Sequence, residues 1–118
     1  MAGKIIAVAF LSRDIAHKEH LKTKSFAQHS ALGSFYDDII GVTDSFAEMY
    51  QGRYGIINDI PTISLKGGKN IADKLEMLMG MIETERKEYA QNDTPIQNKI
   101  DEIVGLYLST LYKLRNLQ

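Results

Sequence analysis

Four stretches of the chain carry apolar residues at helical spacing, and this pattern constrains the fold more than any other feature of the sequence. Recurrence every three or four positions predicts one buried stripe on each helix. The length of 118 residues is close to the commonest size of a domain. We therefore expect an all-α protein with a single domain over residues 1–118. The predicted helices cover residues 4–22, 26–51, 70–91 and 95–117.

The beginning of the first stretch has a second interpretation. Ile5 to Phe10 is a continuous apolar run with β-branched residues, which also fits a buried strand. The helical spacing continues through Leu11 and Ile15, well past the usual length of a strand. The helix is therefore the favoured interpretation, and the strand is the alternative.

Capping residues indicate where the predicted helices begin and end. Ser25 and Thr94 each stand three residues before a glutamine, which is the capping-box pattern. Pro95 follows Thr94 at the first helical position, where proline is favoured. Asn70 opens the third helix, and Gly52 is suited to the position just after the end of the second.

The lengths of the connections predict how the helices are arranged. About three residues join the first helix to the second and the third to the fourth, so each pair must lie antiparallel. Residues 52–69 can reach about 60 Å, which exceeds the ~39 Å length of a 26-residue helix. Two antiparallel hairpins linked by one long crossover form a ferritin-like four-helix bundle. The alternative, an up-down-up-down bundle with a loose loop, conflicts with the apolar residues in this connection, which must be buried.

The composition excludes several classes of protein. The chain has no cysteine, which excludes disulfide scaffolds, thiolate catalysis, zinc fingers and iron–sulfur sites. The net charge is -1, whereas proteins that grip nucleic acid through its phosphates usually carry a basic surplus. The longest apolar run, Ile5 to Leu11, is far shorter than the ~20 residues that span a membrane. We therefore expect no nucleic-acid partner, no membrane association and a cytoplasmic location.

The second predicted helix has a face that is neither plainly solvated nor plainly core. Two glycines lie on it, although each costs roughly 1 kcal/mol relative to alanine, which suggests the close approach of another backbone. These glycines are symmetric about position 37, so two antiparallel copies of the helix would place them opposite each other. We therefore expect a homo-oligomer, at least a dimer, formed through the second helix. The face comprises His29, Gly33, Asp37, Ile40, Gly41, Asp44 and Glu48.

The same pairing would bring His29 of one chain to Asp44 and Glu48 of the other. Within one chain the histidine and Asp44 are fifteen residues apart, or about 22 Å along a helix. One imidazole and two carboxylates suit a divalent metal such as iron. A second nitrogen ligand could come from His17 or His20, and His20 is favoured because the short connection places it nearer. The alternative is a polar dimer seam in which His29 pairs with a carboxylate and no metal is bound.

These residues resemble the iron site of the Dps family, the DNA-protecting mini-ferritins. The resemblance implies that two histidines of one chain join two carboxylates of a neighbour around iron. It also implies that the site oxidises Fe(II) with oxygen or peroxide if it is active. The whole chain, including residues 50–53, is further similar to small bacteriophage proteins with a ferritin-like pattern. The Dps resemblance covers residues 10–52 and is carried by His20-Leu21, Phe26, His29, Asp44 and Glu48.

A second hypothesis gives the oligomer a non-enzymatic role. Lys66-Gly67-Gly68-Lys69 precedes the third predicted helix, where backbone amides and nearby lysines can hold a phosphate. Together with Arg53, these lysines leave room for an anionic ligand at the end of the bundle. A phage protein of this kind would bind a host protein or sequester a small anionic ligand such as a nucleotide signal.

Overall fold

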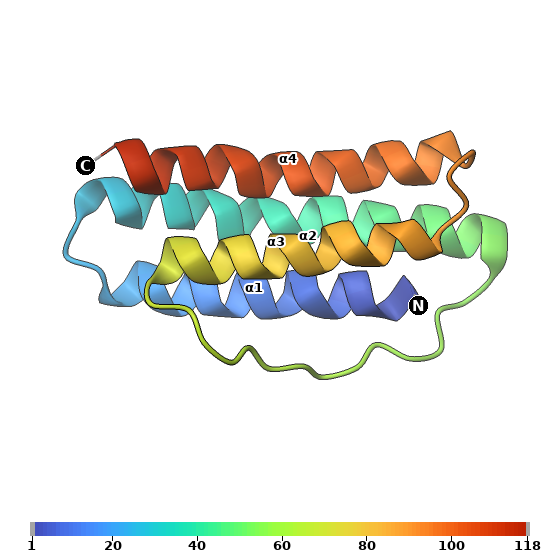
Figure 1. Cartoon of the computed structure of the whole chain (residues 1–118), viewed down its shortest axis with the longest axis horizontal. Coiled ribbons are helices and arrows are strands. Elements are labelled where there is room, and N and C mark those ends of the chain that lie inside the picture. The colour runs from blue at the N-terminus through green and yellow to red at the C-terminus, as the bar shows by residue number, and fades with distance from the viewer. Residues whose placement is uncertain (1, 118) are drawn as a thin grey trace.

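Each of the four predicted helices forms where the apolar spacing placed it (Figure 1). The computed structural model describes residues 2–117, and this range contains four α-helices, one short 3-10 helix and no strand. Residues 5–10 lie inside the first helix, so the strand alternative is wrong. None of the described helices is long and apolar enough to cross a membrane. The helices are α1 (Ala2–Lys22), α2 (Phe26–Tyr54), α3 (Ile71–Glu85) and α4 (Thr94–Asn116), and the 3-10 helix is η1 (Arg86–Glu88).

Side-chain caps confirm the predicted starts of the second and third helices. Ser25 Oγ accepts a hydrogen bond from the N–H of Gln28 at 3.1 Å, and Asn70 Oδ1 accepts one from the N–H of Asp73 at 2.9 Å. These bonds satisfy amides that have no partner within the helix. The second bond of the predicted capping box, from the side chain of Gln28 back to the backbone of Ser25, is wrong. Gln28 Oε1 accepts a hydrogen bond from the Thr23 hydroxyl at 3.1 Å instead.

The cap of α4 is Asp93 rather than the predicted Thr94. A carboxylate oxygen of Asp93 accepts a backbone hydrogen bond in the first turn of α4 at 3.4 Å, and Thr94 is already helical. The side chain of Gln97, expected to bond back to Thr94, accepts instead from Nε of Arg86 at 3.0 Å. This glutamine therefore ties α4 to η1 rather than closing a capping box.

Two helices, α2 and α3, end three or more residues from their predicted ends. α2 continues through Gly52 to Tyr54, and Gly55 follows with a φ of 93°, which glycine adopts readily. Gly52 is an exposed residue within the helix. α3 ends at Glu85, six residues earlier than predicted, because the chain turns there into η1 and is held against α4.

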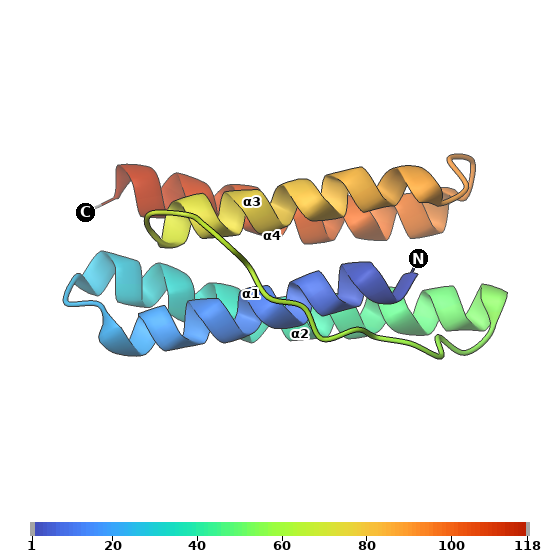
Figure 2. The same cartoon turned by 60° about the horizontal axis from the view of Figure 1, so that its bottom comes forward.

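The helices form two antiparallel hairpins that pack against each other. α1 and α2 make one layer, and α3 and α4 make the other (Figure 2). α2 lies beside α1 and α4, and α1 lies beside α2 and α3, so every neighbouring pair runs antiparallel. The molecule extends 44 × 25 × 21 Å along its principal axes. We call this assembly of four helices the bundle.

Residues 55–70 cross from α2 to α3 along the length of the bundle, beside α1 (Figures 1 and 2). Ile57, Ile63 and Leu65 pack against the core, which confirms that the apolar residues of this connection are buried in part. Gly3 allows the crossover to approach α1 closely, because a Cβ there would overlap the carbonyl oxygen of Asp59. The alternative of an up-down-up-down bundle with a loose loop is therefore wrong.

A buried hydrogen bond crosses the core between α1 and α4. The Tyr107 hydroxyl donates to Ser12 Oγ at 2.6 Å, and both residues are fully buried. Burial raises the pKa of the Tyr107 phenol, so the donor keeps its proton. The ring of Phe35 packs edge-on against the ring of Tyr107, with 5.1 Å between centroids. The other large, fully buried residues include Ile5, Leu32, Ile39, Phe46, Leu75, Leu78, Ile82, Ile96 and Ile100.

Replacing Tyr107 with phenylalanine removes this bond and leaves the Ser12 hydroxyl buried without its partner. We expect the free energy of unfolding to fall by about 1–3 kcal/mol, the usual cost of an unsatisfied buried polar group. Adding Ser12→Ala should recover part of the loss, because the orphaned hydroxyl is then gone. Urea denaturation followed by circular dichroism measures both variants. Equal stability of Tyr107→Phe and the wild type would contradict this role for the bond.

Candidate functional site

Three histidines and a tyrosine gather where α1 meets α2. The turn at residues 23–25 folds α2 back along α1, so the end of α1 lies beside the start of α2. The rings of His20 and His29 stack with 3.7 Å between centroids and 18° between planes. His17 stacks on Tyr36 at 4.1 Å, and His20 meets the same tyrosine edge-on at 5.1 Å. The structure thus brings together His20 and His29, as the short connection predicted.

Two reciprocal hydrogen bonds orient the stacked imidazoles. His20 Nδ1 lies 2.7 Å from the carbonyl oxygen of His29, and His29 Nδ1 lies 2.9 Å from the carbonyl oxygen of His20. A carbonyl oxygen only accepts, so each Nδ1 carries the hydrogen and donates. In the neutral rings this tautomer leaves both Nε2 atoms with a free lone pair. A metal-bound histidine typically donates its other N–H to a carbonyl or carboxylate in the same way.

His20, rather than His17, is the helix-α1 histidine that contacts His29. The ring centroid of His17 is 6.2 Å from that of His20, and its flat contact is with Tyr36. The sequence pattern did not single out Tyr36, which is half-buried and supports two imidazoles. Its position seven residues after His29, two helical turns along the same side, was the available signal.

The structure explains the glycine at position 33 differently from the prediction. A Cβ at this position would lie 3.0 Å from Cε1 and 3.3 Å from Nδ1 of His20. The glycine therefore makes room for an imidazole of its own chain, and the predicted approach of a second backbone is not needed to explain it. Gly41 is exposed, and a Cβ there would meet no atom within 4 Å. Nothing in the described part of the chain accounts for Gly41.

Asp44 and Glu48 lie further along α2, on its exposed side. Both are exposed, and neither makes an ion pair or side-chain hydrogen bond within residues 2–117. About 22 Å of helix separates Asp44 from His29, and about 28 Å separates Glu48 from it. In the described chain, no group of three or more His, Asp or Glu side chains is placed to hold a metal. The predicted ligand set therefore requires a second chain, because one chain holds its two halves at separate places.

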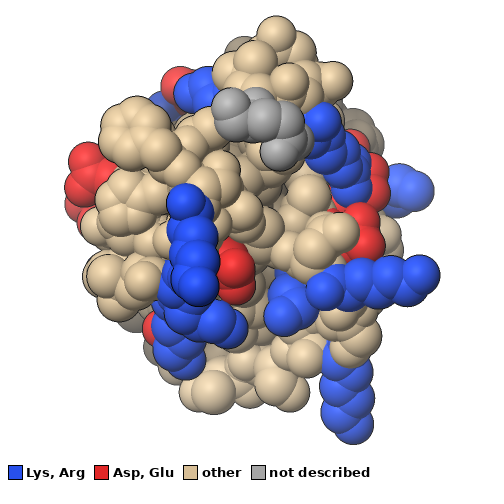
Figure 3. All heavy atoms as spheres, turned by 90° about the vertical axis from the view of Figure 1, so that its left-hand side faces the viewer, with Lys and Arg blue, Asp and Glu red and all other residues tan. Residues whose placement is uncertain are grey.

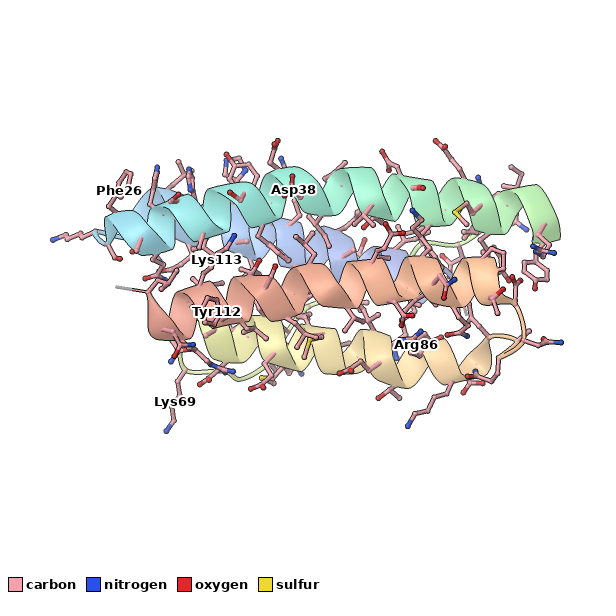
Figure 4. All side chains as sticks on the ribbon, turned by 90° about the horizontal axis from the view of Figure 1, so that it is seen from above. Phe26, Asp38, Lys69, Arg86, Tyr112 and Lys113 are labelled. Atoms are coloured by element: carbon pink, nitrogen blue, oxygen red, sulfur yellow. The ribbon has the colours of Figure 1, made fainter. Side chains whose placement is uncertain are left out.

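Basic residues of other elements surround the start of α2, and acidic residues lie along its middle. Lysine and arginine side chains gather at the end of the bundle where α2 begins (Figure 3). Phe26 marks this end in Figure 4, and Asp38 lies near the middle of α2. From residue 37 to residue 48 the exposed charged side chains of α2 are all acidic. The exposed basic residues at this end of the bundle are Lys18, Lys22, Lys24, Lys66, Lys69, Lys113 and Arg115, and the acidic residues of α2 are Asp37, Asp38, Asp44 and Glu48.

The residues of the anionic-ligand hypothesis do not meet in one chain. Arg53 lies at the end of α2, and its Nε is 3.3 Å from Oδ2 of Asp93. Lys66 and Lys69 precede α3 at the opposite end of the bundle, as Figures 1 and 4 show. The prediction that these three residues share one end is wrong. α2 and α3 run in the same direction, which separates the end of one from the start of the other.

Comparison with known proteins places the chain in a family. Residues 20–114 match a family described as a family of unknown function, DUF5856. The chain belongs to this family. It is also similar to a protein of Enterobacteria phage T4, the uncharacterized 14.6 kDa protein in the mobD-ri intergenic region. The two are 26% identical over 115 residues, which cover 96% of this chain and 87% of the phage protein.

No solved structure matches this DUF5856 chain. The phage relative agrees with the similarity to small bacteriophage proteins expected from the sequence. The family found is one of unknown function rather than the Dps family to which the site residues were compared. The matched segment contains all four predicted metal ligands and begins after His17.

Alanine substitutions test whether Gly33 or Gly41 is required for packing within its own chain. In dilute protein, Gly41→Ala should raise the free energy of unfolding by up to about 1 kcal/mol, because alanine favours the helix and nothing opposes its Cβ. Gly33→Ala should gain less or lose stability, because the new methyl group presses on His20. It should also shift the NMR signals of the His20 and His29 rings.

The control for these variants is Gly105→Ala, at an exposed position of α4 where a Cβ meets no atom within 4 Å. It should gain stability as Gly41→Ala does, without changing the histidine signals. Equal gains for Gly33→Ala and Gly41→Ala, with unchanged histidine signals, would contradict the role given to Gly33.

Proposed function

We propose that the protein is a ferritin-like, Dps-like homo-oligomer, at least a dimer, that binds iron or another divalent metal between subunits. His20 and His29 of one chain would supply nitrogen ligands, and Asp44 and Glu48 of a neighbour would supply oxygen. The observation that carries the proposal is the pair of oriented imidazoles. Each has its Nδ1 bonded to a carbonyl, which leaves its Nε2 open to a metal.

A two-fold axis near residue 37 of α2 would give these ligands the required spacing. Position 29 of one chain then lies opposite position 45 of the other, between Asp44 and Glu48. Lys24, in the turn before α2, is exposed and would lie near the acidic stretch of the partner's α2, so these charges would complement each other. Gly41 would lie within the interface, where the close approach of the partner helix would explain why this residue is glycine. The contacts of a single chain do not explain it.

The donor set fits a divalent metal after one rearrangement. Imidazole nitrogen and carboxylate oxygen together suit iron, manganese or zinc. The planes of the stacked rings differ by only 18°, so their in-plane Nε2 lone pairs do not converge on one ion. One ring must therefore turn about its side-chain bonds. His29 is exposed and free to turn, at the cost of the stack and of one hydrogen bond to a carbonyl.

Fe(II) held at this site would be oxidised to Fe(III), with oxygen or peroxide as the electron acceptor. The residues of the chain would bind and orient the ion. The two neutral imidazoles would donate electron pairs, and the two carboxylates would balance the charge of a divalent cation. Coordination positions left open by the four side chains would admit the oxidant.

Removing the predicted ligands should abolish metal binding and Fe(II) oxidation. We expect the double variants His20→Gln/His29→Gln and Asp44→Asn/Glu48→Gln each to lose at least about 10- to 100-fold in metal affinity, the scale already seen for outer-shell partners of metal ligands. Metal per chain after dialysis, and the rate of Fe(III) formation, are the measurements. Matched controls are His17→Gln and Glu83→Gln, which leave the proposed ligands in place.

Mixing the two double variants tests whether the site lies between subunits. A mixed dimer contains one complete site, with histidines from one chain and carboxylates from the other. After unfolding and refolding together, the mixture should regain roughly a quarter of the wild-type sites, since half of the dimers are mixed. No recovery in a mixture shown to contain mixed dimers would contradict the proposal. A metal-free oligomer that nucleotides stabilise through Lys66 and Lys69 would favour the non-enzymatic hypothesis.

Substitution of Asp37 tests the position of the two-fold axis. In the proposed dimer Asp37 lies opposite its own copy, and like charges at close range repel. Asp37→Asn should therefore tighten the dimer, as measured by sedimentation equilibrium at several salt concentrations. Glu83→Gln, which removes an exposed charge from α3, should leave the dimer unchanged. A weaker dimer for Asp37→Asn would contradict an axis at this position.

A further inference from the structure

A small pocket lies at the other end of the bundle, away from the histidines. It is enclosed by the end of α2 and the connection from η1 to α4, and has a volume of about 250 Å³. Its lining includes Tyr50, Tyr54 and Tyr89, with Glu88 and Asp93. This volume is below the roughly 300–1,000 Å³ of pockets for drug-sized ligands, so it suits a compact head group.

Three tyrosine rings form the aromatic lining of this pocket. The ring of Tyr50 lies 4.7 Å from that of Tyr54 and 5.8 Å from that of Tyr89, at 38° and 56°. The three rings therefore lie in different planes and make a curved wall. The Tyr89 hydroxyl is buried and has no hydrogen-bond partner among the described residues. Burial and the nearby Glu85 carboxylate raise the pKa of Tyr89, so this ring remains neutral.

The carboxylates around the pocket outnumber the cations that pair with them. Asp93 accepts a hydrogen bond from the Tyr54 hydroxyl at 2.5 Å and pairs with Arg53. Glu85, behind Tyr89, has Lys4 Nζ at 3.9 Å. Glu88 is exposed at the pocket and makes no ion pair within residues 2–117. Glu88 is therefore a carboxylate without an ion pair beside the aromatic wall.

We propose that this pocket binds the head group of an alkylammonium cation. The faces of aromatic rings attract cations, and a nearby unpaired carboxylate adds to that attraction. The same charge disfavours anions, and the described chain offers no cluster of three metal-ligating side chains here for a divalent ion. The cation could be a free small amine or the methylated lysine side chain of a polypeptide. The proposal is independent of the proposed metal site, because none of its four ligands lines this pocket.

Choline and its neutral analogue 3,3-dimethylbutan-1-ol test the proposal, because they share a shape and differ in charge. Titrations are followed by NMR of the tyrosine ring protons. Choline should bind saturably, shift the signals of Tyr50, Tyr54 and Tyr89, and bind at least about tenfold more tightly than the alcohol. Equal affinity for the two compounds, or no shift at millimolar choline, would overturn the proposal.

Variants of exposed residues test the lining without disturbing the core. Tyr54→Leu and Glu88→Gln should each weaken choline binding several-fold. Tyr112→Leu, at an exposed tyrosine of α4 near the other end (Figure 4), and Glu83→Gln should not change it. Undiminished choline binding in both Tyr54→Leu and Glu88→Gln would show that choline binds elsewhere on the protein, and would overturn the site.

A short peptide containing trimethyllysine distinguishes the two sources of the cation. Tighter binding of this peptide than of choline would indicate the side chain of a partner polypeptide. Binding of choline alone would indicate a free small amine. Both results support the shared chemistry, whereas failure of both ligands would overturn it and leave the metal site untouched.

Discussion

Burial of the apolar stripe of α2 between α1 and α4 is the interaction on which the rest of the structure depends. Leu32, Phe35, Ile39 and Phe46 are fully buried along this stripe, and each such side chain contributes about 1.5–3 kcal/mol. Because α2 contacts helices of both hairpins, this burial fixes its rotation about its own axis. The rotation in turn leaves the opposite face, with its histidine, glycine and carboxylates, exposed to solvent.

The two ends of the bundle have different chemistry because different turns close them. At one end the turn after α1 stacks His20 on His29, and lysines surround the tip. At the other end the passage from η1 to α4 places Asp93 against the side chains that end α2. Each set of polar groups lies where helix ends leave backbone amides and carbonyls to be satisfied. The paired histidines and the tyrosine pocket of one chain thus lie at opposite ends of its long axis.

Helix positions followed from the spacing of apolar residues, but helix ends depended on contacts far along the chain. The predicted stop at Gly52 was reasonable for a glycine, yet α2 continues until Gly55 takes a positive φ. The contact between Arg86 and Gln97 holds η1 against α4, just after the early end of α3. In the candidate site, the adjacency of His20 and His29 was predictable from the short turn. Their stacking, their tautomers and the role of Gly33 were not, since these depend on ring orientation.

An all-α chain of four helices with a long crossover followed from the amino-acid sequence alone, because helical periodicity and connection lengths are local properties. The sequence also determined which residues share a face of α2. Packing between helices was needed to show that His20 fills the space at Gly33, that Arg53 pairs with Asp93 far from Lys69, and that three tyrosines line one pocket. Those outcomes depend on how side chains from separate helices fit together, and spacing along one helix carries no information about that fit.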